Sequence, residues 1–80
     1  MDKGKVLEHV KCVIKRVQDL DVCLDANLKS DLGLDSLDLL EIVYELEGNL
    51  SIRISESDYE EWNTVEDIVH TVCKELDVEF

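Results

Sequence analysis

Apolar residues recur at intervals of three and four over the first eighteen positions, and polar residues fill the positions between them. The apolar positions are Val6, Val10, Val13, Ile14 and Val17. A period near 3.6 residues is typical of an amphipathic helix with one face on a core. The pattern predicts a helix from about Lys3 to about Gln18.

A second helical period begins at Ser36 and is expected to end near Glu47, where the pair Gly48-Asn49 follows. Three stripes run along it. The core stripe is Leu39, Ile42, Val43 and Leu46; the acidic stripe is Asp38, Glu41 and Glu45; the third stripe is Leu37, Leu40 and Tyr44. We expect the third stripe to be partly exposed beside the acids, which suits a helix that docks on a partner.

The remaining segments predict one short and one longer helix. Ser55 or Ser57 is expected to cap a short helix through about Glu61, and Thr64 to cap the last helix. The core stripe of that last helix is Val65, Ile68, Val69, Val72 and Leu76. Residues 51–55 alternate like a strand but have no partner strand. They are therefore interpreted as an extended linker with Ile52 and Ile54 turned inward.

Residues 19–34 lack a clean period and are interpreted as a long first loop. A short turn near Asp25–Leu28, capped by Asp25, is expected within it. Apolar residues that would pin the loop to the core are Leu20, Val22, Leu24, Leu28 and Leu32. Residues 77–80 are expected to fray. The predicted fold class is all-α: one domain, residues 1–80, forming a small four-helix bundle of three main helices and one short helix.

The start of the second helix is specified by local chemistry. Asp35 is predicted to be its N-cap and to accept the amide of Asp38, which supplies the acidic half of a capping box. Leu34 and Leu39 occupy the two positions of a hydrophobic staple, and Gly33 can adopt a positive φ. Ser36 then lies in the first helical turn, where the helix dipole favours an anion.

The charge balance narrows the possible partners. The net charge is −12, but residues 1–18 carry +3 and residues 19–80 carry −15. Nucleic acid and anionic membranes are therefore poor partners for the main body, and a protein with a basic patch is a good one. Three cysteines without C-x-x-C spacing predict free thiols in a reducing compartment, and the N-terminus lacks the apolar region of a signal peptide.

No catalytic or metal-binding constellation is evident. The run from Gly33 to Leu37 superficially resembles the Gly-Asp-Ser-Leu hydrolases, but a nucleophilic serine needs a base held by a third group. The histidines, His9 and His70, lie far along the chain on predicted helices, and they lack neighbouring ligands that would hold a metal. Ser36 is better interpreted as the acceptor of a covalent modification.

The run Asp-Leu-Gly-Leu-Asp-Ser-Leu-Asp at residues 31–38 resembles the phosphopantetheine attachment motif of acyl carrier proteins. The resemblance covers essentially all 80 residues. It implies that a phosphopantetheinyl transferase moves the 4′-phosphopantetheine arm of coenzyme A onto Ser36. The arm would then carry acyl groups as thioesters, and the protein would present them to fatty-acid or related biosynthetic enzymes without catalysing a reaction.

The resemblance also implies a docking surface and a cellular setting. We expect a monomer in the cytoplasm, meeting basic patches on partner enzymes. The expected docking residues are Asp35, Leu37, Asp38, Leu40, Glu41, Tyr44, Glu45 and Glu47.

Trp62 raises a second possibility for the cargo. A tryptophan before the last helix is reminiscent of D-alanyl carrier proteins, which an ATP-dependent ligase loads with an amino acid. That group usually has Met where this chain has Leu37, and the Gly-Leu-Asp before Ser36 also favours the acyl carriers. We expect Trp62 to be a packed aromatic at a helix junction.

Overall fold

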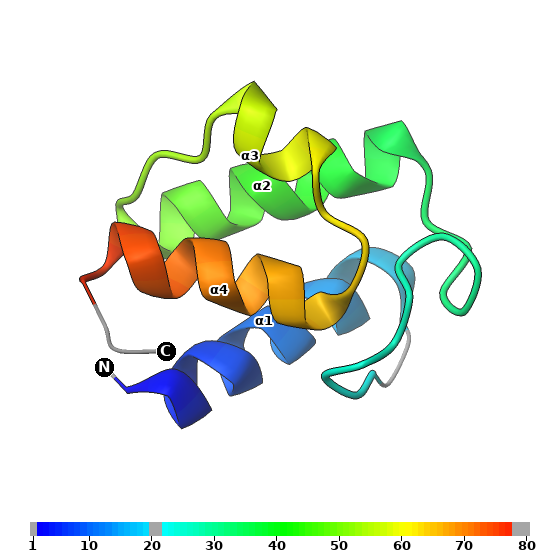
Figure 1. Ribbon diagram of the computed structural model, residues 1–80, viewed down its shortest axis with the longest axis horizontal. Coiled ribbons are helices and arrows are strands. Elements are labelled where there is room, and N and C mark those ends of the chain that lie inside the picture. Colours follow the sequence, from blue (N-terminus) through cyan, green and yellow to red (C-terminus); the bar gives the residue numbers. More distant parts are fainter. Residues whose placement is uncertain (1, 20–21, 78–80) are drawn as a thin grey trace.

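Four α-helices form within residues 2–19 and 22–77, the ranges that the computed structural model describes (Figure 1). They are α1 (Lys3–Gln18), α2 (Ser36–Leu50), α3 (Glu56–Glu60) and α4 (Val65–Glu75). The described ranges contain no strand, so the predicted all-α class is confirmed. None of these helices combines the length and the apolar character that a bilayer-spanning segment requires.

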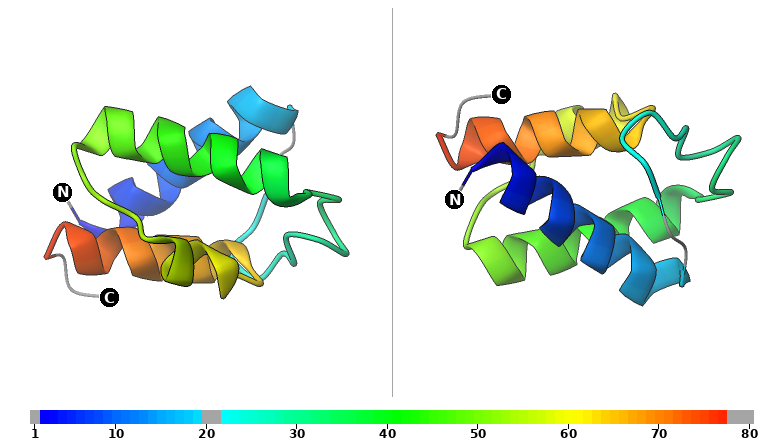
Figure 2. Two further views of the ribbon diagram at one scale, coloured as in Figure 1. Left: turned by 90° about the horizontal axis from the view of Figure 1, so that it is seen from above. Right: turned by 90° about the horizontal axis from the view of Figure 1, so that it is seen from below.

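The core lies where α1 crosses the other two main helices. α1 packs against both α2 and α4, and Figure 2 shows it running obliquely across them, on the opposite side from α3. The predicted apolar stripes supply its centre: Val6, Val10, Val13, Ile14, Leu39, Ile42, Val43, Leu46, Val65, Ile68, Val69 and Val72 are all buried. α3 contributes no buried residue, so it lies on the bundle rather than within it.

The loop before α2 is tied to the start of α4. The carbonyls of Leu24 and Ala26 accept the amides of Glu66 (2.9 Å) and Val65 (3.1 Å), and the Leu28 amide donates to the Asn63 carbonyl (2.8 Å). Two first-turn amides of α4, which have no partner within that helix, are thereby satisfied. Leu28 is fully buried beside this junction. Val22, Leu24 and Leu32 also pack on the core as predicted, and Leu20 lies outside the described residues.

The predicted end of α2 near Glu47 was wrong. The helix continues through Gly48 and Asn49 to Leu50, and the left-handed residue is Ser51, at φ 55°. Leu50 packs partly buried against the core, which offsets the roughly 1 kcal/mol that a glycine costs inside a helix.

The segments after α2 follow the prediction more closely. Ile54 is buried and Ile52 is partly buried, so the linker between α2 and α3 turns its isoleucines inward. Of the two candidate caps for α3, Ser55 is the one used: its Oγ accepts the Asp58 amide at 3.2 Å. Fraying was predicted for residues 77–80. Of these, residues 78–80 lie outside the described ranges.

Candidate functional site

The start of α2 has the predicted reciprocal cap. The Asp38 amide donates to Asp35 Oδ1 at 2.9 Å, and the Asp35 amide donates to Asp38 Oδ2 at 3.1 Å. Both staple residues, Leu34 and Leu39, are buried. Ser36 is therefore the first residue of a helix whose N-terminus is capped, and Ser36 is exposed.

A tight turn delivers the chain to this cap. Asn27 Oδ1 accepts the amides of Lys29 (3.0 Å) and Ser30 (2.9 Å), while Asp31 Oδ2 accepts the Asn27 amide at 2.8 Å. Gly33 adopts φ 68°, a left-handed conformation that suits glycine. The prediction of Asp25 as the cap in this loop was wrong, because the amide side chain of Asn27 organises the turn.

A groove of about 150 Å³ adjoins Ser36. Its lining residues are Lys29, Ser36, Leu39, Tyr59, Glu60 and Trp62. They come from the turn, from the first half of α2 and from α3 with the residues just after it. Sequence reasoning did not bring these segments together, because no period or motif connects a loop lysine with α3.

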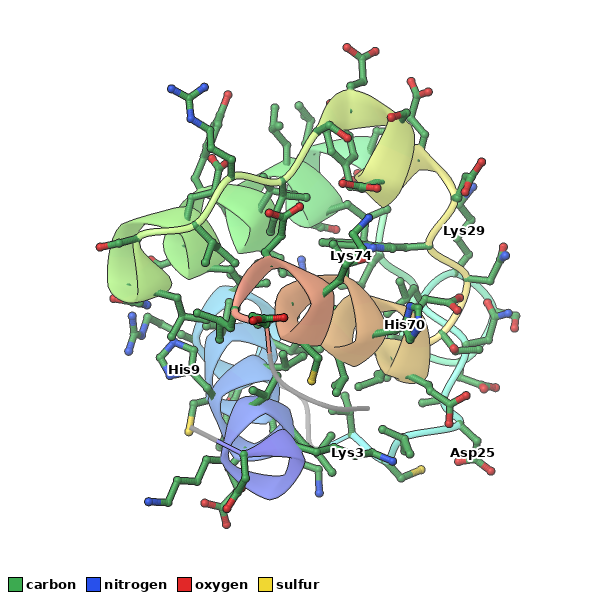
Figure 3. The ribbon with its side chains drawn as sticks, turned by 60° about the vertical axis from the view of Figure 1, so that its left-hand side comes forward. Lys3, His9, Asp25, Lys29, His70 and Lys74 are labelled. Atoms are coloured by element: carbon green, nitrogen blue, oxygen red, sulfur yellow. The ribbon has the colours of Figure 1, made fainter. Side chains whose placement is uncertain are left out.

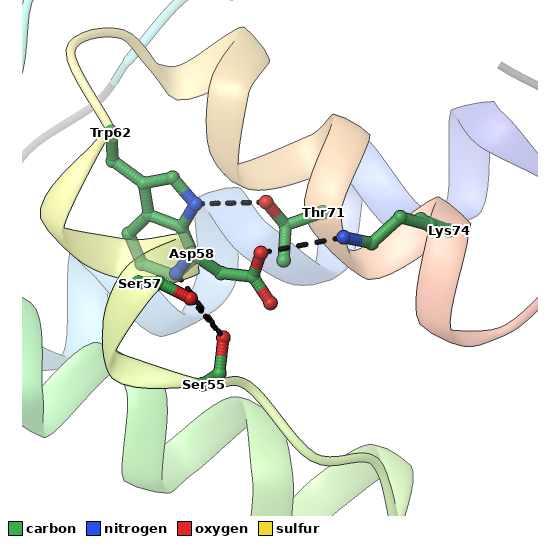
Figure 4. Close-up of polar contacts among 6 residues, drawn as sticks. All are labelled: Ser55, Ser57, Asp58, Trp62, Thr71 and Lys74. Atoms are coloured by element: carbon green, nitrogen blue, oxygen red, sulfur yellow. Dashed lines mark hydrogen bonds and ion pairs between the residues drawn. The ribbon is translucent and has the colours of Figure 1, made fainter.

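The far side of this groove is held in place by polar contacts to α4 (Figure 4). The Trp62 indole Nε1–H donates to Thr71 Oγ1 at 2.9 Å, with both side chains buried. Lys74 pairs with Asp58 at 3.3 Å. A hydrogen bond between the Ser55 side chain and the Asp58 carboxyl, together with the Lys74 pair, lowers the pKa of that carboxyl. Trp62 is a packed aromatic at a helix junction, as predicted.

Negative charge gathers at α3. A hydrogen bond to Glu56 and the charge of that residue raise the pKa of Glu60. Burial and the charges of Glu56 and Glu60 raise the pKa of Tyr59. An additional anion entering the groove therefore meets an environment that already disfavours negative charge.

The outer face of α2 is apolar and acidic. Leu37 is 73% exposed and Tyr44 is 62% exposed, while Leu40 is half-buried. These three side chains, with Asp38 and Glu41, line a shallow depression of about 300 Å³. The structure thus places the predicted third stripe on the surface beside acidic groups.

The acidic residues of α2 differ in how they are engaged. Glu45 pairs with Arg16 of α1 at 2.8 Å, and Glu47 accepts the Ile54 amide at 2.9 Å. Asp38 accepts Gln18 Nε2 at 2.6 Å in addition to its capping role. Glu41 is exposed, and its side chain makes no ion pair or hydrogen bond with a described residue.

The groups that could make Ser36 a nucleophile lie elsewhere. Neither His9 nor His70 lines the groove. Cys73 is buried, which raises the pKa of its thiol, and the hydrogen bond and charge of Asp25 raise the pKa of the Cys23 thiol. Within the described ranges, no three His, Cys, Asp or Glu side chains are arranged to hold a metal ion. The groove therefore presents the Ser36 hydroxyl without a histidine beside it to act as a base.

A family model described as the phosphopantetheine attachment site matches residues 5–72. This match defines the class of protein as a domain that receives a phosphopantetheine arm. The acyl carrier protein of Onion yellows phytoplasma is 43% identical over 72 residues, which cover 86% of this chain and 95% of that protein. The chain belongs to the acyl carrier protein family. Its members are carriers of acyl groups, and the aminoacyl alternative is not favoured.

Two solved structures show the same arrangement of helices. A crystal structure of an acyl carrier protein from Thermotoga maritima has a TM-score of 0.83 at 24% identity, covering 96% of this chain and 93% of that one, and shows the fold alone. A chain from a structure titled the ishigamide ketosynthase/chain length factor has a TM-score of 0.75 at 25% identity, covering 89% and 93%.

The surroundings of Ser36 fit the prosthetic group of this family. An exposed hydroxyl stands at a helix N-terminus, where free backbone amides favour a phosphate. The adjoining groove offers one cation, Lys29, and apolar surface from Leu39 and Trp62, which suits an anionic head followed by an aliphatic chain. When bound, the group supplies the thiol that holds an acyl thioester.

Proposed function

We propose that Ser36 is the residue that carries the arm, so that this protein shuttles acyl thioesters among biosynthetic enzymes. The observation that supports the proposal most directly is the exposure of the Ser36 hydroxyl on the capped first turn of α2. Capping by Asp35 and Asp38 fixes the backbone around the acceptor, so a transferase meets it in one orientation.

The attachment is a phosphoryl transfer that the partner enzyme must catalyse. Ser36 Oγ forms a bond to the phosphorus that bears the pantetheine portion of coenzyme A. The pyrophosphate bond breaks, and adenosine bisphosphate leaves. The hydroxyl proton passes to a base of the transferase.

Intact mass spectrometry after incubation with coenzyme A and a broad-specificity transferase tests the proposal. The protein should gain the mass of one phosphopantetheinyl group, and Ser36→Ala should gain none. Ser30→Ala is the matched control, because Ser30 is an exposed serine in the preceding turn and its loss should leave the gain intact. A gain that persists in Ser36→Ala would place the arm on another residue.

The outer face of α2 is the docking surface in this proposal. Exposed Leu37 and Tyr44 with half-buried Leu40 supply apolar contact, and acidic side chains supply attraction to basic patches. The acidic members are Asp35, Asp38, Glu41, Glu45 and Glu47. Among them Glu41 is the most available, whereas Glu45 and Glu47 also hold Arg16 and the Ile54 amide.

Reversing the charge of one residue at a time distinguishes docking at the outer face of α2 from an effect of the overall negative charge of the protein. Glu41→Lys should lower kcat/KM of the transferase several-fold at low salt, because opposite charges speed encounter. Glu75→Lys changes the net charge equally at the exposed end of α4, so it serves as the control and should have little effect. Equal losses in both variants would mean that only the overall charge matters.

The expected partners are the transferase and acyl-transferring or acyl-modifying enzymes with basic docking patches. The similarity to a chain from a ketosynthase/chain length factor structure supports a role beside acyl-handling enzymes. Free thiols at Cys12, Cys23 and Cys73 suit the reducing cytoplasm, where we place the protein as a monomer. Analytical ultracentrifugation of the modified protein tests the oligomeric state.

A further inference from the structure

Among the described residues, Lys29 is the only lysine or arginine that lines the groove beside Ser36. Its backbone is fixed on both sides, because its amide donates to Asn27 Oδ1 at 3.0 Å and its carbonyl accepts the Gly33 amide at 3.1 Å. Its side chain is exposed, and the ammonium forms no ion pair with a described residue. Because the Lys29 backbone is held in place and its ammonium has no ion-pair partner among the described residues, this side chain is well suited to bind an anion.

Other cations in the described ranges are placed differently. Lys74 is paired with Asp58, and Arg16 is paired with Glu45. The lysines of α1 do not line the groove, and in Figure 3 Lys29 lies well apart from Lys3. Lys29 is thus the cation that the fold brings to the acceptor serine.

Apart from the backbone amides of the first turn of α2, the other charged groups near Ser36 are unfavourable for an anion. Asp35 and Asp38 flank the serine in sequence and bracket the first turn of α2, and Glu60 lines the groove. A hydrogen bond to Glu56 and the charge of Glu56 already raise the pKa of Glu60, so further negative charge is disfavoured there. A phosphodiester on Ser36 would add another negative charge beside these groups, so a nearby cation would have a measurable effect.

The apolar part of the groove gives the rest of the arm a surface to lie on. Leu39 is 6% exposed and Trp62 is 3% exposed, so both side chains are held in the packed core and only a small part of each lines the groove. Tyr59 contacts Trp62 edge-to-face, with ring centroids 6.4 Å apart. The groove volume of about 150 Å³ offers room for the first part of a pantetheine chain.

We propose that the Lys29 ammonium pairs with the phosphodiester on Ser36 and thereby directs the first part of the arm into the groove lined by Leu39, Tyr59 and Trp62. This inference rests on the proposed attachment at Ser36. Lys29 is a positioning residue: it holds the arm against the bundle between encounters with enzymes and takes no part in acyl transfer. Because the pair is exposed, it should favour the docked arm by roughly two- to five-fold over a variant without the charge, and salt should weaken it.

Energy transfer from Trp62 to a dye on the arm measures this docking directly. Trp62 is the single tryptophan of the chain and lines the groove. Coenzyme A that carries a dansyl group on its thiol is loaded by the transferase, which leaves the protein's own exposed cysteines unlabelled. Mass spectrometry with peptide fragmentation first confirms one dye-bearing arm on Ser36 in each variant, so only fully loaded samples are compared.

The expected energy-transfer efficiency depends on the charge of the side chain at position 29. Transfer efficiency should fall in Lys29→Gln and be retained in Lys29→Arg, and high salt should bring the unsubstituted protein down to the level of Lys29→Gln. Lys5→Gln removes the same charge from an exposed site on α1 and should leave transfer unchanged. Phosphorus NMR relaxation provides a second measurement, since the phosphodiester should become more mobile only in Lys29→Gln.

The outcomes separate this inference from the proposed function. If no variant accepts the arm on Ser36, the proposed attachment fails. If all variants are loaded but Lys29→Gln matches Lys5→Gln in both energy transfer and phosphorus relaxation, the attachment stands and the role of Lys29 is wrong. The Lys29 side chain is exposed and its ammonium forms no ion pair with a described residue, so all variants should melt alike, and circular dichroism verifies this.

Discussion

The hydrogen bond between Trp62 and Thr71 offers a sharp test of how the groove is held together. Thr71→Val keeps the side-chain shape but removes the oxygen that accepts the indole Nε1–H at 2.9 Å. Because Trp62 is 3% exposed and Thr71 is 7% exposed, water cannot readily replace that acceptor. A buried unsatisfied donor costs about 1–3 kcal/mol.

The net effect should be slightly smaller than that cost. The valine methyl group gains up to about 0.8 kcal/mol of apolar burial. We therefore expect the free energy of unfolding to fall by roughly 0.2–2.2 kcal/mol. For a chain of this size, that loss lowers the melting temperature by about 1–18 °C.

A double-mutant cycle with Trp62→Phe isolates the hydrogen bond from the change in packing. Phenylalanine has no N–H, so Thr71→Val should cost little in that background, and the two backgrounds should differ by at least about 1 kcal/mol. Urea unfolding followed by far-ultraviolet circular dichroism is suitable because Trp62→Phe removes the fluorescent reporter. If Thr71→Val costs the same with and without the indole, the hydrogen bond does not stabilise this junction.

Other predictions concern charge. Asp35→Ala should lower stability by about 0.5–2 kcal/mol through loss of the N-cap, and Asp35→Asn should recover most of it in thermal melts; equal losses would argue against capping. The stability from Asp58 should be present above its ordinary pKa of 3.8 and disappear as pH falls through its lower folded value. Asp58→Asn should therefore be less stable than the unsubstituted protein near neutral pH but not in strong acid, and a pH-independent difference in urea midpoints would refute this. Moderate salt should raise the melting temperature because the net charge is −12, whereas a salt-independent value would mean that repulsion is negligible.

The start of α2 was predictable because its determinants are local. Asp35 and Asp38 cap one another across three residues, and Leu34 and Leu39 lie close along the chain. The apolar periods of α1 and α4 likewise identified their buried faces, since a helix turns a fixed angle per residue. The exposed position of Ser36 follows from the same local geometry.

The end of α2 and the turn before it depended on contacts with other segments. Leu50 extends the helix because the core receives it, although Gly48 and Asn49 favour an earlier end. Asn27 organises the turn that Asp25 was expected to cap, and the same region bonds to the start of α4. Competing local signals were therefore resolved by tertiary packing.

The sequence by itself determined the helices, their core faces, the capped serine and the acidic character of the surface around it. Only the tertiary structure decided which acids are engaged, as in the pairing of Glu45 with Arg16, and which residues meet at the groove beside Ser36. Lys29 and Trp62 lie on segments that touch because the loop hydrogen-bonds to the junction before α4. Periodicity and capping act over a few residues, whereas a groove is formed by surfaces from distant parts of the chain.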